Sequence, residues 1–124
     1  MKDVTDYIDT DSIDNLFQLF CERLNRSPTS LAYQQYDEST GLWGTYSWAE
    51  VADDVACWQA AFKSEQLIAG DAVAIMVRNC REWAIFDIAA LSMGLVVIPL
   101  YTEDRPDNVS YILNDANAQL LLID

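Results

Sequence analysis

The residue types that this 124-residue chain lacks already narrow the chemistry open to it. It contains no histidine, which removes the Ser-His-Asp and Cys-His catalytic arrangements and the usual zinc sites. The four glycines stand at 41, 44, 70 and 94, too far apart to build a loop that cradles phosphate. The three cysteines form no C-x-x-C pair. They predict partly buried thiols in a reducing cytosol and no metal site.

Polar residues after two apolar runs are the main binding candidates. Arg78-Asn79 follows the first run, and Tyr101-Thr102-Glu103 follows the second. Doubly wound sheets bind ligands beyond the carboxyl ends of their strands. Tyr101 and Thr102 therefore have a positional argument as ligand contacts, with loop structure as the alternative. Neither segment has the glycines that let a backbone approach phosphate, so the chain alone is not expected to form a nucleotide site.

Other chemically suggestive residues have simpler structural roles. Asp53 and Asp54 form an acidic pair, but they fall in the second turn of an expected helix, where acids favour the helix dipole and face water. Glu82 fits best as the capping partner of Asn79. Trp83 falls on an apolar helix face, which favours core packing.

Three nearly continuous apolar runs, 72–77, 95–100 and 119–123, must position these candidates. Such runs are typical of parallel strands that are covered on both faces. The gaps between them are long enough for crossover helices. Gly94 ends the first of these helices, and Pro106 stands at the first position of the second. The sequence thus predicts a layered, three-strand parallel βαβαβ sheet over about residues 72–123.

A helix and a hairpin are expected before this sheet. Apolar spacing predicts a helix from Ile13, capped by Ser12 or Asp11 and stopped by Pro28. Residues 31–46 read as strand, turn and strand.

A capping box, Ser47-Trp48-Ala49-Glu50, then opens a helix that runs to about Glu65. The fold class is therefore α/β, with flanking helices around the parallel sheet.

Charge and the chain ends bear on partners and location. The net charge is −13, which repels phosphate backbones and argues against nucleic acid as a partner. The first residues have no signal-peptide pattern, and the longest apolar stretch, 95–101, is too short to span a bilayer. We expect a cytoplasmic protein. The aliphatic run that ends the chain, 120–123, looks like a strand with nothing after it to cover it, and suggests a piece of a longer polypeptide.

The order of several segments resembles the adenylate-forming, AMP-binding enzymes, in particular long-chain fatty-acid–CoA ligases (acyl-CoA synthetases). The resemblance covers about residues 12–124. It rests on five segments in the family's order: Thr45-Tyr46-Ser47-Trp48-Ala49-Glu50-Val51, Gly70-Asp71-Ala72-Val73-Ala74-Ile75-Met76, Asn79-Cys80-Arg81-Glu82-Trp83, Leu91-Ser92-Met93-Gly94-Leu95-Val96-Val97-Ile98-Pro99-Leu100-Tyr101 and Tyr111-Ile112-Leu113-Asn114-Asp115-Ala116.

The resemblance implies an activity for a complete enzyme. Such an enzyme uses ATP and Mg²⁺ to convert a fatty acid to an acyl-adenylate, then transfers the acyl group to coenzyme A. The family's phosphate loop and catalytic lysine have no match in this chain, so the resemblance assigns no catalytic residue, and no cofactor is expected to bind the chain alone. It places Tyr101 and Thr102 near the coenzyme A entrance. Glu103 and Asp104 beside them would repel coenzyme A phosphates.

Residues 1–11 are acidic and poorly periodic, and we expect them to form a frayed leader. The resemblance implies that residues 12–124 form the N-terminal part of the large adenylating domain, truncated before the phosphate loop. The expected partner is the remainder of that domain, and an exposed cut face would allow self-association. A complete enzyme could associate peripherally with a membrane. The alternatives are an adenylation domain of another acceptor class, such as a peptide synthetase or a luciferase-like enzyme, and a non-enzymatic truncated interaction module.

Overall fold

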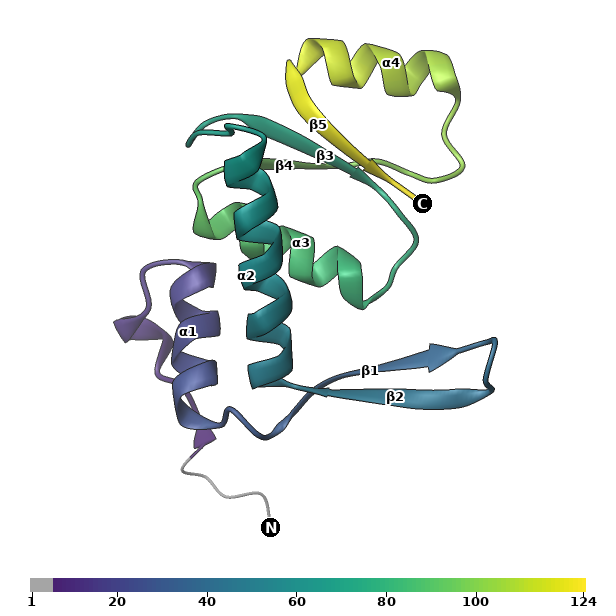
Figure 1. Ribbon diagram of the computed structural model, residues 1–124. Helices are drawn as coiled ribbons and strands as arrows, with labels where there is room; N and C mark the ends of the chain where they lie inside the picture. The colour runs from purple at the N-terminus through teal and green to yellow at the C-terminus, as the bar shows by residue number, and fades with distance from the viewer. Residues whose placement is uncertain (1–5) are drawn as a thin grey trace. The chain divides into compact units, whose positions relative to one another are not determined.

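The chain, shown as a computed structural model in Figure 1, divides into two compact units, Met1–Asp54 and Val55–Asp124. The structure describes residues 6–124, so residues 1–5 of the predicted leader lie outside the described residues. The boundary between the units falls inside one helix, α2 (Trp48–Ser64). Each unit contains its own sheet.

The first helix of the first unit, α1, spans Leu16–Arg26 and starts later than predicted. Ser12 and Asp11 do not cap it. They belong to a short 3₁₀ turn, η2 (Thr10–Ser12). The cap is Asn15, whose Oδ1 accepts a hydrogen bond from an amide of the first turn at 2.9 Å. Asparagine is among the strongest N-capping residues, so the helix begins directly after Asn15.

The predicted hairpin is confirmed. Strand β1 (Leu31–Asp37) pairs antiparallel with β2 (Leu42–Ser47), and Tyr36 stands opposite Trp43. The link between the strands closes with Gly41 at φ +70°, a left-handed conformation that glycine adopts without a Cβ clash.

The predicted capping box at the start of α2 is also confirmed. The Ser47 amide donates to Glu50 Oε2 at 2.7 Å, and the Glu50 amide donates back to Ser47 Oγ at 3.3 Å. The first helical residue, Trp48, packs its ring against Phe20 of α1 and Tyr33 of β1. The cap and these ring contacts together fix where the hairpin turns into the helix.

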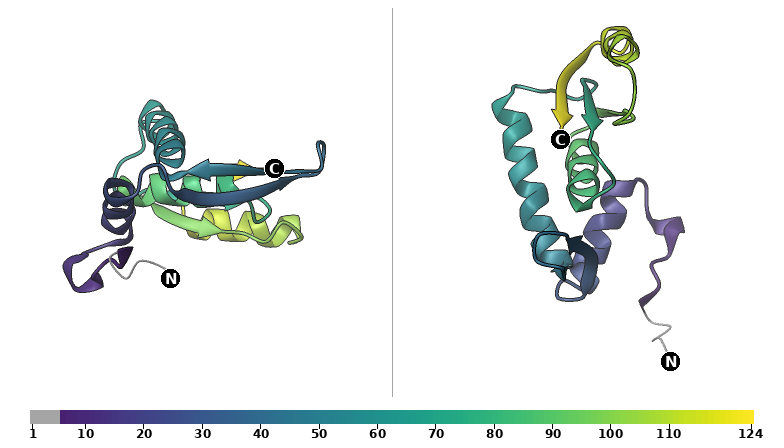
Figure 2. Two further views of the ribbon diagram at one scale, coloured as in Figure 1. Left: turned by 90° about the horizontal axis from the view of Figure 1, so that it is seen from below. Right: turned by 90° about the vertical axis from the view of Figure 1, so that its right-hand side faces the viewer.

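The second unit contains the predicted parallel sheet. Its strands are β3 (Ala72–Met76), β4 (Val96–Pro99) and β5 (Ala118–Ile123), in the order β4-β3-β5 with both pairings parallel. Helix α3 (Arg81–Ser92) links β3 to β4, and α4 (Pro106–Asp115) links β4 to β5. Figure 1 shows α3 below the strands and α4 above them, and Figure 2 shows β3 and β5 side by side. The predicted α/β class, with its βαβαβ sheet, helix and hairpin, is confirmed.

Burial is uneven across this sheet. The first four residues of β3 are buried, and an aromatic cluster of Trp58, Phe62 and Phe86 forms the adjacent core, with ring centres 5.1–5.7 Å apart. The prediction that all three strands are covered on both faces is wrong for the outer two. Val96 of β4 is 52% exposed and Ile123 of β5 is 61% exposed. A helix packed over the middle of a sheet covers less of the strands at its margins.

The ends of α3 and α4 test three local predictions. Gly94 follows α3 at φ +71°, and Pro106 is the first residue of α4, both as predicted. The predicted pairing of Asn79 with Glu82 is wrong. The N-cap is Cys80, which makes no side-chain capping bond, so Glu82 is only the second helical residue and cannot complete a capping box. Within residues 6–124, no helix is long and apolar enough to cross a membrane.

Candidate functional site

The parallel strands end on one edge of the sheet in the second unit, and this edge carries the sequence-predicted binding residues. We call it the carboxyl edge and define it by Arg78, Asn79, Tyr101, Thr102 and Asp124. Arg78 and Asn79 follow β3, Tyr101 and Thr102 follow β4, and Asp124 follows β5. Parallel pairing brings these three strand ends together. Ligands of open α/β sheets bind at such an edge.

The backbone around Tyr101 is held on both sides. Leu100 is buried, and its amide donates to the Ile75 carbonyl at 2.9 Å, which fixes the chain where it leaves β4. The Asp104 amide then donates to the Tyr101 carbonyl at 3.1 Å and closes a turn. The side chain of Tyr101 is 84% exposed, and Thr102 is exposed beside it. Both therefore lie on the carboxyl edge with their side chains open to solvent, and their role in binding stays a prediction.

The charges at this edge are mixed. Arg78 Nε lies 3.7 Å from Asp124 Oδ2, and both side chains are largely exposed, so this ion pair contributes little to stability. Asp104 is turned toward the start of α4, because its Oδ2 accepts a hydrogen bond from Asn108 Nδ2 at 2.6 Å. Glu103 is exposed. The five residues of the carboxyl edge thus offer an aromatic ring, a hydroxyl and one paired cation, but no two side chains placed for general acid–base catalysis.

Sequence reasoning missed an apolar groove in the second unit. It lies between α4 and the sheet and has a volume of about 320 Å³. The signal that could have revealed it is the helical spacing of Pro106, Val109 and Leu113 next to an aliphatic strand. Its lining residues are Met76, Asp104, Pro106, Val109, Ser110, Leu113, Leu121 and Ile123.

Three titratable groups with shifted pKa values lie on different elements. Burial raises the pKa of Asp87 on α3 and of Tyr33 on β1. The Ser39 hydroxyl and amide donate hydrogen bonds of 2.6 and 2.9 Å to the carboxyl of Asp37 at the end of β1, and these bonds lower its pKa. In the described part of the chain, no group of three or more His, Cys, Asp or Glu residues could hold a metal ion.

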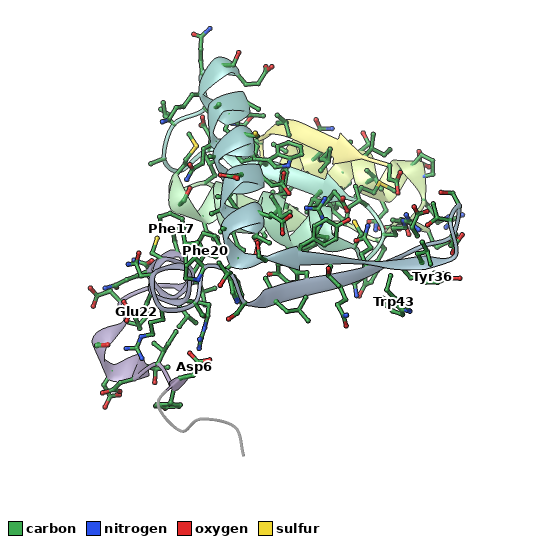
Figure 3. All side chains as sticks on the ribbon, turned by 60° about the horizontal axis from the view of Figure 1, so that its bottom comes forward. Asp6, Phe17, Phe20, Glu22, Tyr36 and Trp43 are labelled. Atoms are coloured by element: carbon green, nitrogen blue, oxygen red, sulfur yellow. The ribbon has the colours of Figure 1, made fainter. Side chains whose placement is uncertain are left out.

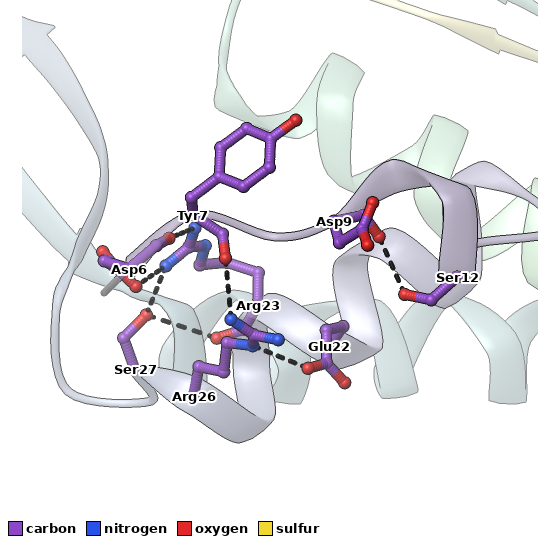
Figure 4. A network of polar contacts seen from close by, with 8 residues as sticks. All are labelled: Asp6, Tyr7, Asp9, Ser12, Glu22, Arg23, Arg26 and Ser27. Carbon is purple, nitrogen blue, oxygen red and sulfur yellow. Dashed lines mark hydrogen bonds and ion pairs between the residues drawn. The ribbon is translucent and has the colours of Figure 1, made fainter. Parts of the chain in front are cut away.

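Two cations of the first unit hold the chain ahead of α1 against that helix, as Figure 4 shows. Arg23 pairs with the Asp6 carboxylate and donates to the Asp6 carbonyl, and Arg26 donates to the Tyr7 carbonyl at 2.8 Å. Arg26 also binds Glu22 one turn earlier at 2.6 Å. The structural role of Arg23 and Arg26 is therefore to hold Asp6 and Tyr7 against α1.

The first unit also presents an exposed aromatic pair. The rings of Tyr36 and Trp43 lie 5.5 Å apart on the hairpin, labelled in Figure 3, and are 48% and 64% exposed. Such cross-strand pairs stabilise a hairpin, which is sufficient to explain them.

The other residues that the sequence singled out lie on different elements. Asp53 is exposed and Asp54 half-buried on α2, while Trp83 is half-buried on α3. The prediction of partly buried thiols holds for two of the three cysteines. It is wrong for Cys57, which is exposed.

The AMP-binding enzyme family model matches residues 20–124. The chain therefore belongs to the AMP-binding enzyme family. Among curated relatives, it is 31% identical to the long-chain-fatty-acid–CoA ligase FadD15 of Mycobacterium bovis over 108 residues, which is 87% of this chain and 18% of that protein. It is 28% identical to long chain acyl-CoA synthetase 2 of Arabidopsis thaliana, over 90% of this chain and 17% of that protein. The chain thus spans less than a fifth of the length of these relatives.

Among solved structures, the N-terminal subdomain of Klebsiella oxytoca NpsA matches with a TM-score of 0.77 and 25% identity. The match covers 90% of this chain and 28% of the NpsA chain. A related structure is described as an artificially fused adenylation–PCP di-domain from a peptide synthetase, NpsA-ThdA, and matches with a TM-score of 0.76 and 26% identity over 87% of this chain and 19% of that one. The predicted fold is thus shared with adenylation-domain N-terminal subdomains.

Proposed function

We propose that this chain is the N-terminal scaffold of a fatty-acid–CoA ligase. The complete enzyme would use ATP and Mg²⁺ to form an acyl-adenylate from a fatty acid, and would then transfer the acyl group to the thiol of coenzyme A. The observation that carries the proposal is the 31% identity to a long-chain-fatty-acid–CoA ligase over 87% of this chain. The remainder of the same adenylating domain would supply the ATP site and the catalytic groups.

Within that enzyme, the scaffold would present Tyr101 and Thr102 at the entrance for coenzyme A. The exposed ring of Tyr101 can stack on an adenine, and the Thr102 hydroxyl can donate or accept a hydrogen bond. The phosphates of coenzyme A fit this edge poorly. Its one cation, Arg78, is already paired with Asp124, and Glu103 is exposed nearby. Residues outside this chain would have to hold them.

The scaffold assignment is tested first on the chain itself. We expect no ATP–pyrophosphate exchange above background with a long-chain fatty acid, because the chain's four glycines, at 41, 44, 70 and 94, are too far apart to build a phosphate loop. Measured exchange would contradict the assignment.

Placing this chain in two different host enzymes tests which class of enzyme it comes from. This chain would replace the matching segment of FadD15 in one chimera and of NpsA in another, and each chimera would be assayed with its host's own substrates. The proposal expects activity in the FadD15 host and loss in the NpsA host. The reverse result would favour the second candidate, a peptide-synthetase adenylation domain, which the NpsA match supports. Two folded but inactive chimeras would argue against a scaffold role.

The coenzyme A contact is tested in the active chimera. Tyr101→Ala and Thr102→Ala should raise the KM for coenzyme A severalfold and leave the KM for ATP and fatty acid unchanged. Tyr111→Ala is the matched control, because Tyr111 is an exposed aromatic residue on α4, away from the carboxyl edge. Equal effects of Tyr101→Ala and Tyr111→Ala would remove the proposed contact.

A further inference from the structure

The turn at residues 101–104, which carries Tyr101 and Thr102, is held at both of its ends. Before the turn, Leu100 is buried and its amide donates to the Ile75 carbonyl at 2.9 Å. At its end, the Asp104 amide donates to the Tyr101 carbonyl at 3.1 Å, which is the hydrogen bond that closes a β-turn. The two central residues of the turn are exposed. The conformation of this turn therefore decides where the Tyr101 ring and the Thr102 hydroxyl lie.

The side chain of Asp104 ties the end of this turn to α4. Asp104 is half-buried, whereas the residues on either side of it are exposed. Its Oδ1 accepts a hydrogen bond from the Arg105 amide at 2.8 Å, and its Oδ2 accepts one from Asn108 Nδ2 at 2.6 Å. Hydrogen bonds to an ionised group are the stronger kind, and two of them fix the orientation of the carboxylate. The turn and the first turn of α4 are thereby joined through one side chain.

The start of α4 gives this carboxylate a clear role. The N-cap, Arg105, makes no side-chain capping bond, and Pro106 follows it as the first helical residue. A negative charge next to a helix N-terminus is stabilised by the helix dipole. Asp104 therefore supplies the charge and the hydrogen bonds that the side chain at the N-cap does not supply.

The orientation of Asp104 alters the expectation drawn from its charge. The sequence alone predicts that Asp104 repels the phosphates of coenzyme A. In the structure, both of its carboxylate oxygens are bonded to groups at the start of α4. The hydrogen bonds that hold the turn join residue 75 and residues 100–108 of this chain. The effect of Asp104 on Tyr101 thus comes through hydrogen bonds within this segment.

We propose that Asp104 is a positioning residue for coenzyme A, which holds the turn at residues 101–104 in the conformation that presents Tyr101 and Thr102 to this ligand. The inference rests on the proposed function, in which these two side chains contact coenzyme A. The carboxylate of Asp104 does not contact the ligand and acts through the turn. Loss of its two hydrogen bonds releases one end of the turn from α4, while Leu100 still holds the other end.

The mobility of the turn tests the positioning step in the chain itself, with no ligand present. Measurements of ¹⁵N relaxation should give the Thr102 and Glu103 amides order parameters of about 0.8 in the parent and below about 0.6 in Asp104→Ala. Asp104→Asn should keep the turn ordered, because its Oδ1 can accept from the Arg105 amide and its Nδ2 can donate to the side-chain oxygen of Asn108. An equally ordered turn in Asp104→Ala, or a turn that is already mobile in the parent, would overturn the proposal.

Steady-state kinetics in the active FadD15 chimera tests the consequence for coenzyme A. Asp104→Ala should raise the KM for coenzyme A about three- to tenfold, the factor expected for a lost hydrogen bond, and leave kcat and the KM for ATP unchanged. Asn108→Ala removes only the hydrogen bond to Oδ2 and changes no charge, so it should raise the same KM by a smaller factor. Asp104→Asn should keep this KM within about twofold of the parent, because both hydrogen bonds can form.

Glu103→Ala is the matched control that separates the hydrogen bonds of Asp104 from its charge. It removes the same charge from the neighbouring, exposed position. If repulsion of phosphate were the main effect, Glu103→Ala, Asp104→Ala and Asp104→Asn would all lower the KM for coenzyme A. The positioning role expects that, of these three variants, Asp104→Ala alone raises it. A KM that is unchanged or lowered in Asp104→Ala would overturn the proposal.

Tyr101→Ala in the same chimera distinguishes a failure of this inference from a failure of the proposed function. If Tyr101→Ala raises the KM for coenzyme A and Asp104→Ala does not, the coenzyme A contact stands and the positioning role is wrong. If neither variant raises it, the coenzyme A contact itself is wrong and the positioning role falls with it. The relaxation measurement then shows separately whether Asp104 holds the turn.

Discussion

Strands β3 and β5 are both rich in aliphatic residues and lie side by side, but they are buried to different extents. Ala72–Met76 is almost fully buried, whereas the residues of Ala118–Ile123 alternate between half-buried and exposed. Within residues 6–124, β3 is flanked by a strand on each side, while β5 pairs with β3 alone and lines the groove beside α4. An aliphatic run thus specifies a strand, but its neighbours decide how much the strand contributes to stability.

The largest expected effect lies in the aromatic core beside β3. Phe86 is fully buried and contacts the rings of Trp58 and Phe62 edge-on at 5.1 and 5.2 Å. Phe86→Ala should lower the free energy of unfolding by about 3–5 kcal/mol, because it leaves a cavity and removes both ring contacts. Tyr111→Ala is the matched aromatic control on α4, where the side chain is 66% exposed, and should cost under about 1 kcal/mol. Urea denaturation measures both free energies of unfolding. Similar losses in the two variants would contradict the expected difference between a buried and an exposed aromatic residue.

The two isoleucines of β3 and β5 give the most direct comparison. Ile75 is fully buried and Ile123 is 61% exposed. Ile75→Ala should cost about 2–5 kcal/mol and Ile123→Ala under about 1 kcal/mol. Both should be measured by urea denaturation at low protein concentration, so that self-association does not contribute. A loss at Ile123 as large as that at Ile75 would show that β5 is covered in solution.

A smaller and opposite effect is expected at the start of α3. Cys80 is the N-cap, with φ −152° and ψ 173°, and makes no side-chain capping bond. Serine has nearly the same shape and caps helices well, so Cys80→Ser should raise the free energy of unfolding by about 0.5–1 kcal/mol. Cys57→Ser, on the exposed face of α2, is the matched control and should change it by less than about 0.5 kcal/mol. No gain at Cys80 would mean that Arg81–Ser92 is already held by its packing alone.

Features set by neighbouring residues could be predicted from the sequence, whereas features set by packing between distant elements could not. The Ser47–Glu50 capping box, Gly94 after α3 and Pro106 at the start of α4 were predictable, because each follows from the conformation of a few neighbouring residues. The parallel sheet was predictable because its apolar runs are separated by helical spacing. The exposure of Leu121 and the groove beside α4 were not. They depend on what packs over β5, and no local pattern encodes that.

In the candidate site, too, some features were predictable from the sequence and others depend on tertiary contacts. The place of Tyr101 and Thr102 at the carboxyl edge follows from the end of an apolar run and was predictable. The pairing of Arg78 with Asp124 joins residues 46 positions apart and depends on β3 and β5 being neighbours. The turn of the Asp104 carboxylate toward Asn108 depends on where α4 begins.

The smallest expected effect is a pH dependence of the free energy of unfolding that comes from Asp87 on α3. Burial raises the pKa of Asp87 on α3 above its ordinary value of 3.8, since it disfavours the charged form. The folded state then holds this proton more tightly than the unfolded state. The contribution of Asp87 to stability is therefore greatest below about pH 3.8 and is lost as pH rises through the folded-state pKa. Asp87→Asn should stabilise the protein at neutral pH, and this gain should shrink as the pH is lowered toward 3.8. Asp53→Asn removes an exposed charge from α2 and controls for the general benefit of lowering the net charge of −13. Thermal unfolding of both variants and the parent across this pH range measures the difference. If the two substitutions gave equal gains at every pH, partial burial in α3 would not be the cause.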